Sequence, residues 1–264
     1  LLAIGEDEEA SLHIEEAFVL DGTRWQAHEL ASYLHAKHGV LAHNSGVQWL
    51  ANEHFASAEV EAQAAAKLGP KEALPYISLF LSKWLPALLE LRADPTEGLK
   101  DLGTYEEISE LLQTGAALAP TYPQLKQYAI SCKLAPFFAA QMVKGIGATL
   151  WAGLDEQQKR ILTACRDEFL ELGQTDPRLR SNALLFAGVA NFMMDDKPKM
   201  YEAFQQAADG APEGTAALET MVGFLANDRE WVKALEAAEV IMQRQPSGTA
   251  YSWIGRIYAE QKKW

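Results

Sequence analysis

Cysteine is scarce in this chain: the 264 residues include only Cys132 and Cys165. Two cysteines support neither a disulfide framework nor a zinc site built from thiolates. Both stand in apolar, helix-like surroundings, which favours reduced thiols in a core. The two could pair if their segments were neighbours, so the sequence leaves an oxidising compartment open.

Positive charge is also in short supply. The chain has 23 lysines and arginines against 36 aspartates and glutamates, a net charge of -13 and a pI near 4.9. A surface this acidic repels phosphate backbones and anionic lipid head groups. We therefore expect no nucleic-acid or membrane-surface partner. A protein or peptide partner, favoured if it is basic, fits the charge better.

Long uninterrupted apolar runs are missing. The two stretches nearest to membrane length are 73–91 and 134–152, and each is broken by a lysine and by helix-breaking residues. Lys83 with Pro86 interrupts the first, and Lys144 with nearby glycines interrupts the second. These features predict buried helices and no membrane span.

No targeting segment is evident at the start of the sequence. The chain begins at Leu1, and no basic n-region with a cleavable apolar stretch precedes the acidic run 6–9. The sequence favours a cytoplasmic protein. A periplasmic or lipid-anchored subunit of an envelope or transport assembly is an alternative if a signal was removed upstream of Leu1.

Motifs of catalysis are absent from the sequence. It has no G-x-S-x-G nucleophile motif, and the pair Gly145 and Gly147 lacks the third glycine and the preceding strand of a phosphate-binding loop. The acidic clusters have the character of solvated surface. We expect a protein that is not an enzyme and that needs no cofactor.

Helical periodicity runs through the whole chain, whereas alternating strand patterns are nearly absent. Apolar residues recur at spacings of three and four, as they do between Ile161 and Leu172. The sequence therefore predicts an all-α protein of about a dozen helices. The predicted spans are 7–19, 24–38, 46–68, 72–92, 105–117, 122–144, 146–152, 156–172, 178–194, 198–209, 214–227, 230–244 and one from 248.

Capping residues and glycines mark the predicted helix ends. Thr23, Thr104 and Asp155 each precede a Gln or Glu by three residues, which is the spacing of a capping box. Asp176 before Pro177 predicts a further helix start. The predicted helix stops are Gly39, Gly69, Gly173 and Gly210.

The polar segment 92–103 is the best candidate for a boundary between two regions. It divides the chain into an N-terminal helical region, residues 1–100, and a second region, residues 104–264. The first region could contain degenerate copies of the repeat that the second region shows.

A repeat is visible in the C-terminal half. Pro177, Pro212 and Pro246 stand at helix junctions and follow one another at nearly equal intervals. A period of about 34 residues with one helix pair per unit is typical of the tetratricopeptide repeat (TPR). The matching positions between the prolines are Leu184, Gly188, Phe204 and Ala207 in one unit, Leu218, Leu225 and Ala234 in the next, and Tyr251, Gly255 and Tyr258 in the last.

Residues 155–264 therefore resemble a TPR array, with departures from the pattern at Asn191, Met200 and Val222. The resemblance implies an α-solenoid of antiparallel helix pairs that acts as a protein–protein scaffold within a larger complex. In such arrays the first helix of each unit lines a concave, partner-binding surface. The residues predicted to face the partner are Asn182, Leu185, Val189, Phe192, Glu219, Asn227, Ser252 and Arg256. Alternatively, Leu185 and Phe192 belong to the core between repeats.

All six histidines lie near the start of the sequence, between His13 and His54. His28 and His35 are seven residues apart and so share one helix face, and His38 follows three residues after His35. Two imidazoles on one face could bind a metal ion together with a carboxylate. A metal- or ligand-binding helical protein is therefore the alternative function. Exposed or capping histidines explain the same pattern without a metal.

Overall fold

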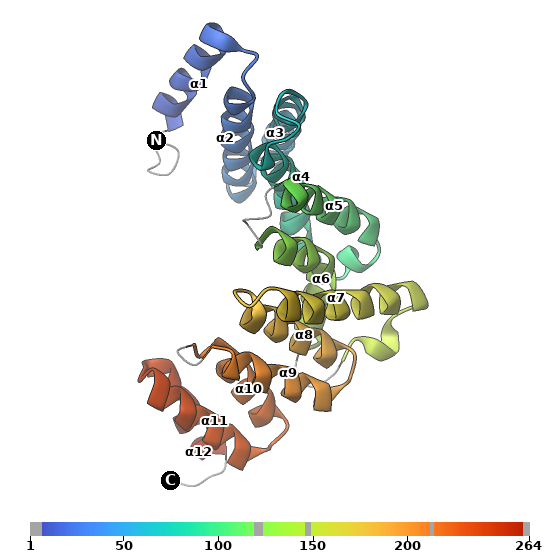
Figure 1. Cartoon of the computed structure of the whole chain (residues 1–264), viewed down its shortest axis with the longest axis vertical. Coiled ribbons are helices and arrows are strands. Elements are labelled where there is room, and N and C mark those ends of the chain that lie inside the picture. The colour runs from blue at the N-terminus through green and yellow to red at the C-terminus, as the bar shows by residue number, and fades with distance from the viewer. Residues whose placement is uncertain (1–6, 119–123, 146–148, 212–213, 261–264) are drawn as a thin grey trace. The chain divides into compact units, whose positions relative to one another are not determined.

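The computed structural model describes residues 7–118, 124–145, 149–211 and 214–260. Within these ranges the chain forms twelve α-helices and two short 3-10 helices, and no residue is in a strand (Figure 1). The predicted all-α fold of about a dozen helices is confirmed. The chain divides into two compact units, Leu1–Cys132 (unit 1) and Lys133–Trp264 (unit 2). The predicted division into residues 1–100 and 104–264 stays a prediction.

Unit 1 consists of helices that pack mainly against their neighbours in sequence, and α2 also packs against α4. Among its described residues, two apolar clusters contribute to the core. Ile14 of α1 packs against α2, and Phe55 of α3 packs with Leu89 of α4. The helices are α1 (Asp7–Asp21), α2 (Trp25–Asn44), α3 (Gln48–Leu68), α4 (Ala73–Ala93), η2 (Glu97–Leu99), α5 (Leu102–Leu118) and the first part of α6 (Gln124–Lys144).

Unit 2 repeats one simple arrangement, in which each helix from α7 to α12 packs against the next (Figure 1). Short connections join these helices, so that consecutive ones run antiparallel, as a TPR-like array requires. The elements are the rest of α6, η3 (Trp151–Gly153), α7 (Glu156–Thr175), α8 (Arg180–Met193), α9 (Lys197–Asp209), α10 (Ala216–Asn227), α11 (Trp231–Arg244) and α12 (Gly248–Glu260).

The turns of unit 2 show the repeat in atomic detail. Asp195 between α8 and α9 and Arg229 between α10 and α11 stand one repeat period apart, and both have positive φ, 62° and 61°. Each turn has the same two backbone hydrogen bonds, from Asp195 to Phe192 and from Asp196 to Asn191 in the first turn. The counterparts one period later are Arg229 to Ala226 and Glu230 to Leu225.

The helix pair α2–α3 of unit 1 has the same geometry. Its turn residue Gly46 has φ 78°, and the bonds from Gly46 to His43 and from Val47 to Ala42 repeat the pattern seen in unit 2. Inside the pair, the ring of Phe55 lies against Gly39, sixteen residues earlier. This pair is therefore a TPR-like unit that the proline period did not reveal.

Two predicted helix stops are wrong. The helix α2 continues past Gly39 to Asn44, and α7 continues past Gly173 to Thr175. Both glycines serve packing instead. A Cβ on Gly39 would lie 2.7 Å from the Phe55 ring, and one on Gly173 would touch Ala183 and Leu184 of α8. The stops at Gly69 and Gly210 are confirmed as helix C-caps.

The predicted helix starts have mixed outcomes. Asp155 forms the predicted capping box with Gln158. The capping boxes at Thr23 and Thr104 are wrong, because Asp21 and Asp101 accept the hydrogen bonds of the two threonine hydroxyls. The two aspartates organise these turns more effectively because the acceptor carries a full charge.

Two further helix predictions need correction. Asp176 accepts a hydrogen bond from the Arg178 amide at 3.1 Å, but α8 begins only at Arg180, after a turn. Of the predicted helix 146–152, residues 146–148 lie outside the described part of the chain. The described remainder, 149–152, forms no α-helix and contributes only to the 3-10 helix η3.

Candidate functional site

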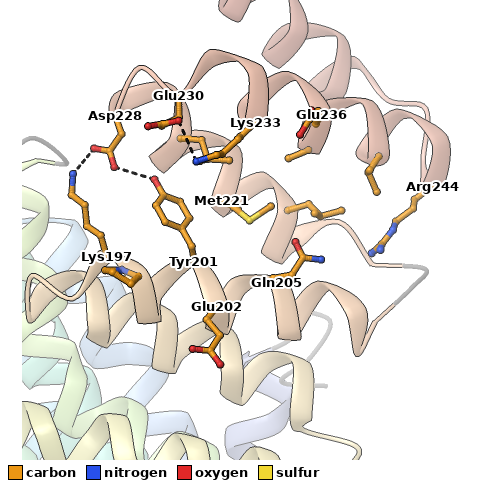
Figure 2. A pocket seen from close by; sticks show the side chains of 15 residues that line it. Lys197, Tyr201, Glu202, Gln205, Met221, Asp228, Glu230, Lys233, Glu236 and Arg244 are labelled. Atoms are coloured by element: carbon orange, nitrogen blue, oxygen red, sulfur yellow. Dashed lines mark hydrogen bonds and ion pairs between the residues drawn. The ribbon is translucent and has the colours of Figure 1, made fainter.

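A surface groove of about 1020 Å³ lies in unit 2 between α9, α10 and α11 (Figure 2). Its floor is apolar. Leu218, Met221 and Leu225 of α10 contribute to it at a helical spacing of three and four, and Ala237 and Val240 of α11 extend it. The three α10 side chains are at most 9% exposed, so that the floor is anchored in the core of the unit.

The α11 helix can form a wall of the groove because it is strongly amphipathic. Ala234, Ala238 and Ile241 point into the unit and are fully buried. Glu236 and Val240 lie beside this stripe and face the groove. The alanines allow α11 to approach its neighbours closely, since they bring little volume to the interface.

One end of the groove is closed by a bonded cluster around Asp228. Lys197 donates to Asp228 Oδ1 at 2.6 Å, and the Tyr201 hydroxyl donates to Asp228 Oδ2 at 3.0 Å (Figure 2). Burial, with the hydrogen bond to Asp228, raises the pKa of Tyr201 well above its usual range. Tyr201 therefore stays neutral near pH 7 and ties α9 to the C-terminal end of α10.

The other end is closed by Arg244. Its Nη1 atom donates to three backbone carbonyl oxygens, those of Ala208, Ala211 and Gly214, at 3.0 to 3.2 Å. Carbonyls at the end of α9 have no partner within the helix, and a guanidinium satisfies them well. Arg244 thus holds the α9–α10 connection against α11.

The walls carry further charged side chains. Lys233 on α11 pairs at 3.3 Å with Glu230, the residue just before that helix. Glu202 on α9 accepts a hydrogen bond from Gln206, a residue of its own helix. Glu236 is exposed on α11 and forms no ion pair with another of the described residues.

The residues predicted to face a partner do not line this groove. Asn182 and Ser252 are exposed, whereas Leu185 and Val189 are half-buried. The Phe192 side chain is only 4% exposed, and its ring packs 4.5 Å from that of Phe224, which places Phe192 in the core between two repeats.

The structure brings two of the predicted residues together. Asn227 and Arg256 line a smaller pocket of about 270 Å³, where Arg256 lies 5.6 Å from the ring centre of Trp253. Glu219 on α10 accepts a hydrogen bond from Thr215, the residue just before that helix. A partner-binding role for this face stays a prediction.

Sequence reasoning missed the groove. The apolar spacing of Leu218, Met221 and Leu225 was a visible signal, but it indicates a buried helix face as readily as a groove floor. The lysine and arginine bonds that close the two ends join residues that lie far apart in the sequence, such as Lys197 with Asp228. Such pairings follow from the fold and leave no local trace in the sequence.

The histidines predicted as metal ligands do not share one site: His28 has different contact partners from His35 and His38. His28 lies 2.6 Å from Glu61 and 3.1 Å from the Gly22 carbonyl oxygen, whereas His35 lies 3.3 Å from His54. The ring of His38 is 5.3 Å from that of His54. In the described part of the chain, no group of three His, Cys, Asp or Glu side chains is arranged to hold a metal ion.

Both cysteines are buried, and neither forms a disulfide. Burial raises the pKa of Cys132 to about 12. A thiol with so high a pKa is not a nucleophile near neutral pH, because the thiolate is the reactive form.

None of the described helices combines the length and the apolar character needed to cross a membrane.

The sequence matches no protein-family model and no curated protein. Among solved structures, PilF of Pseudomonas aeruginosa superposes with a TM-score of 0.47 at 14% identity, over 89% of this chain and 86% of that chain. The Cut9–Hcn1 hetero-tetramer of the APC/C gives a TM-score of 0.34 at 9% identity. That superposition covers 96% of this chain and 46% of that chain.

The fold is a TPR-like helical repeat. This conclusion rests on the helix packing and on the turn geometry that recurs from one helix pair to the next.

Proposed function

We propose that the chain is a protein-interaction scaffold that binds a segment of a partner protein in the groove of unit 2. The observation that carries the proposal is the groove itself, with its apolar floor from α10 and its polar walls from α9 and α11. An apolar floor with a polar rim is the usual composition of an interaction site.

Its rigidity supports the same function. Asp228 and Arg244 fix the ends of the groove through side-chain bonds between its elements. A preformed groove loses little conformational entropy on binding, so that most of the ordering cost falls on the partner segment. This is an efficient arrangement for capturing an unfolded or helical peptide.

The lining offers little for catalysis. The described residues that line the groove include no histidine, cysteine or serine. Its tyrosine stays protonated near neutral pH, as the direction of its pKa shift requires. Nothing in the described lining of the groove therefore combines a nucleophile with a base, whereas its apolar area suits binding.

Photo-crosslinking tests the proposal. The photoreactive residue p-benzoylphenylalanine replaces Gln205, which lines the groove, in the full chain added to native extract. A matched control replaces Gln243, an exposed glutamine of α11 outside the groove, and a third variant replaces Asn182. We expect a protein adduct from position 205 and none from position 243.

The other outcomes are equally informative. Adducts from position 182 alone would move the partner site to the face predicted from the sequence and would contradict a groove site. No adduct from any of the three positions would contradict the scaffold function.

A further inference from the structure

We propose that the groove selects an amphipathic partner segment whose polar side carries lysine or arginine. This inference rests on the proposed function, since it names the chemistry of the segment that the groove would bind. It follows from which charged side chains of the groove are already bonded within the protein and which remain exposed to a partner.

The cations of the groove are already engaged. Lys197 is bonded to Asp228 at 2.6 Å, and Arg244 is bonded to three backbone carbonyls. Lys233 is paired with Glu230 at 3.3 Å. The positive charges of Lys197 and Lys233 are therefore already compensated by neighbouring carboxylates, so a partner carboxylate would meet a nearly neutral ion pair and gain little from it.

The carboxylates of the groove are more available. Glu202 on α9 and Glu236 on α11 are exposed and contribute to the lining of the groove from two different helices. The Glu202 side chain extends away from Met221 in Figure 2, so that its carboxylate lies at the outer rim of the groove. Figure 2 shows the two residues on the helices that flank the groove. Within the described part of the chain, Glu202 is bonded only to the neutral Gln206.

This arrangement matches a basic amphipathic helix or strand. Its apolar side chains would contact Leu218, Met221 and Leu225, while lysine or arginine stems on either side would extend over the walls toward the two carboxylates. Charges at the rim contribute mainly to selectivity and association rate, whereas the floor supplies affinity.

The selectivity is local to the groove. Unit 1 has eight basic and nineteen acidic residues, a net charge of -11, whereas unit 2 has fifteen and seventeen, a net charge of -2. The unit that contains the groove is therefore close to neutral overall. A preference for a basic segment must come from particular side chains, and point substitutions can test it.

Two synthetic peptides test the inference. They are labelled helices of equal length with an identical leucine face, and their polar faces carry lysine in one and glutamate in the other. Fluorescence anisotropy with the full chain should give a Kd for the lysine peptide about tenfold lower or better, because opposite rim charges attract and like charges repel. The lysine peptide could also bind the acidic unit 1, so the decisive readout is the effect of groove variants.

The double variant E202K/E236K should lose most of the preference for the lysine peptide. The control E239K changes an exposed glutamate of α11 that does not line the groove, and it should leave the preference almost unchanged. Circular dichroism confirms that each variant is folded. Equal affinity for the two peptides, or equal loss of preference in E239K and E202K/E236K, would overturn the inference.

The inference and the proposed function can fail separately. If position 205 crosslinks a partner but the variants do not change the preference, the groove binds proteins without selecting basic ones. If neither peptide binds and position 205 gives no adduct, both ideas fail.

Discussion

At the scale of single residues, the fold depends on glycines that admit an aromatic ring. Gly188 of α8 lies against Phe204 of α9, as Gly39 lies against Phe55 in unit 1. In both pairs the phenylalanine follows the glycine by sixteen residues. The sequence placed Gly188 at a matching position of the repeat but assigned Gly39 to a helix stop, because glycine is common both in close packing and at helix ends.

Replacing Gly188 by alanine should destabilise unit 2. The added Cβ would lie 2.5 Å from the Phe204 ring, and Phe204 is fully buried and has little room to move. We expect a loss of about 1–3 kcal/mol in the free energy of unfolding, as is usual for overpacking in a core.

Gly255→Ala is the matched control, since Gly255 also lies in a helix and has nothing within 4 Å of its missing Cβ. This variant should be neutral or stabilised by up to about 1 kcal/mol. Chemical denaturation of both variants measures the difference. Equal free energies of unfolding in the two would contradict the packing role of Gly188.

At the scale of elements, most helices could be predicted from apolar periodicity, but their ends could not. Thr23 and Thr104 have capping spacing, yet nearby aspartates accept the hydrogen bonds. The proline period revealed the repeat in unit 2 but not the α2–α3 pair, whose likeness to the repeat lies in the geometry of its turn at Gly46. The groove was missed because its closed ends depend on tertiary bonds such as Lys197 to Asp228.

The α2–α3 pair should also respond to pH. Burial lowers the pKa of His35, and burial together with the His38 charge lowers that of His54. The charge of Glu61 on His35 and that of Glu53 on His54 oppose these shifts. The unfolded chain therefore binds more protons than the folded one below about pH 6.5, the ordinary histidine pKa.

Stability from these groups is thus present above about pH 6.5 and is lost as the pH falls through the lower folded-state pKa values. His54→Gln should flatten the fall in stability between about pH 7 and pH 5. Hydrogen exchange of the α2 and α3 amides at several pH values measures this. His13→Gln removes an exposed histidine of α1 as a control. An unchanged pH dependence in His54→Gln would contradict the account.

At the scale of the whole molecule, composition favours some classes of partner over others but does not indicate where on the chain a partner would bind. The net charge of -13 predicted a basic partner, yet unit 1 holds -11 of it and the groove lies in unit 2. The preference for a basic segment is argued instead from Glu202 and Glu236, whose availability depends on which cations the fold has already paired. Charge balance alone does not contain that information.

The central claim is that the groove of unit 2 binds a protein partner. Its most direct test compares how tightly two variants bind the partner identified by crosslinking, measured as a Kd. Val240→Asp places a charge at the groove. Val232→Asp places the same charge eight residues earlier on α11, at an exposed position outside the groove. We predict that Val240→Asp weakens binding about tenfold or more while Val232→Asp changes it little, since a buried carboxylate is costly at an apolar contact. Equal affinity of the two folded variants for the partner would contradict the claim.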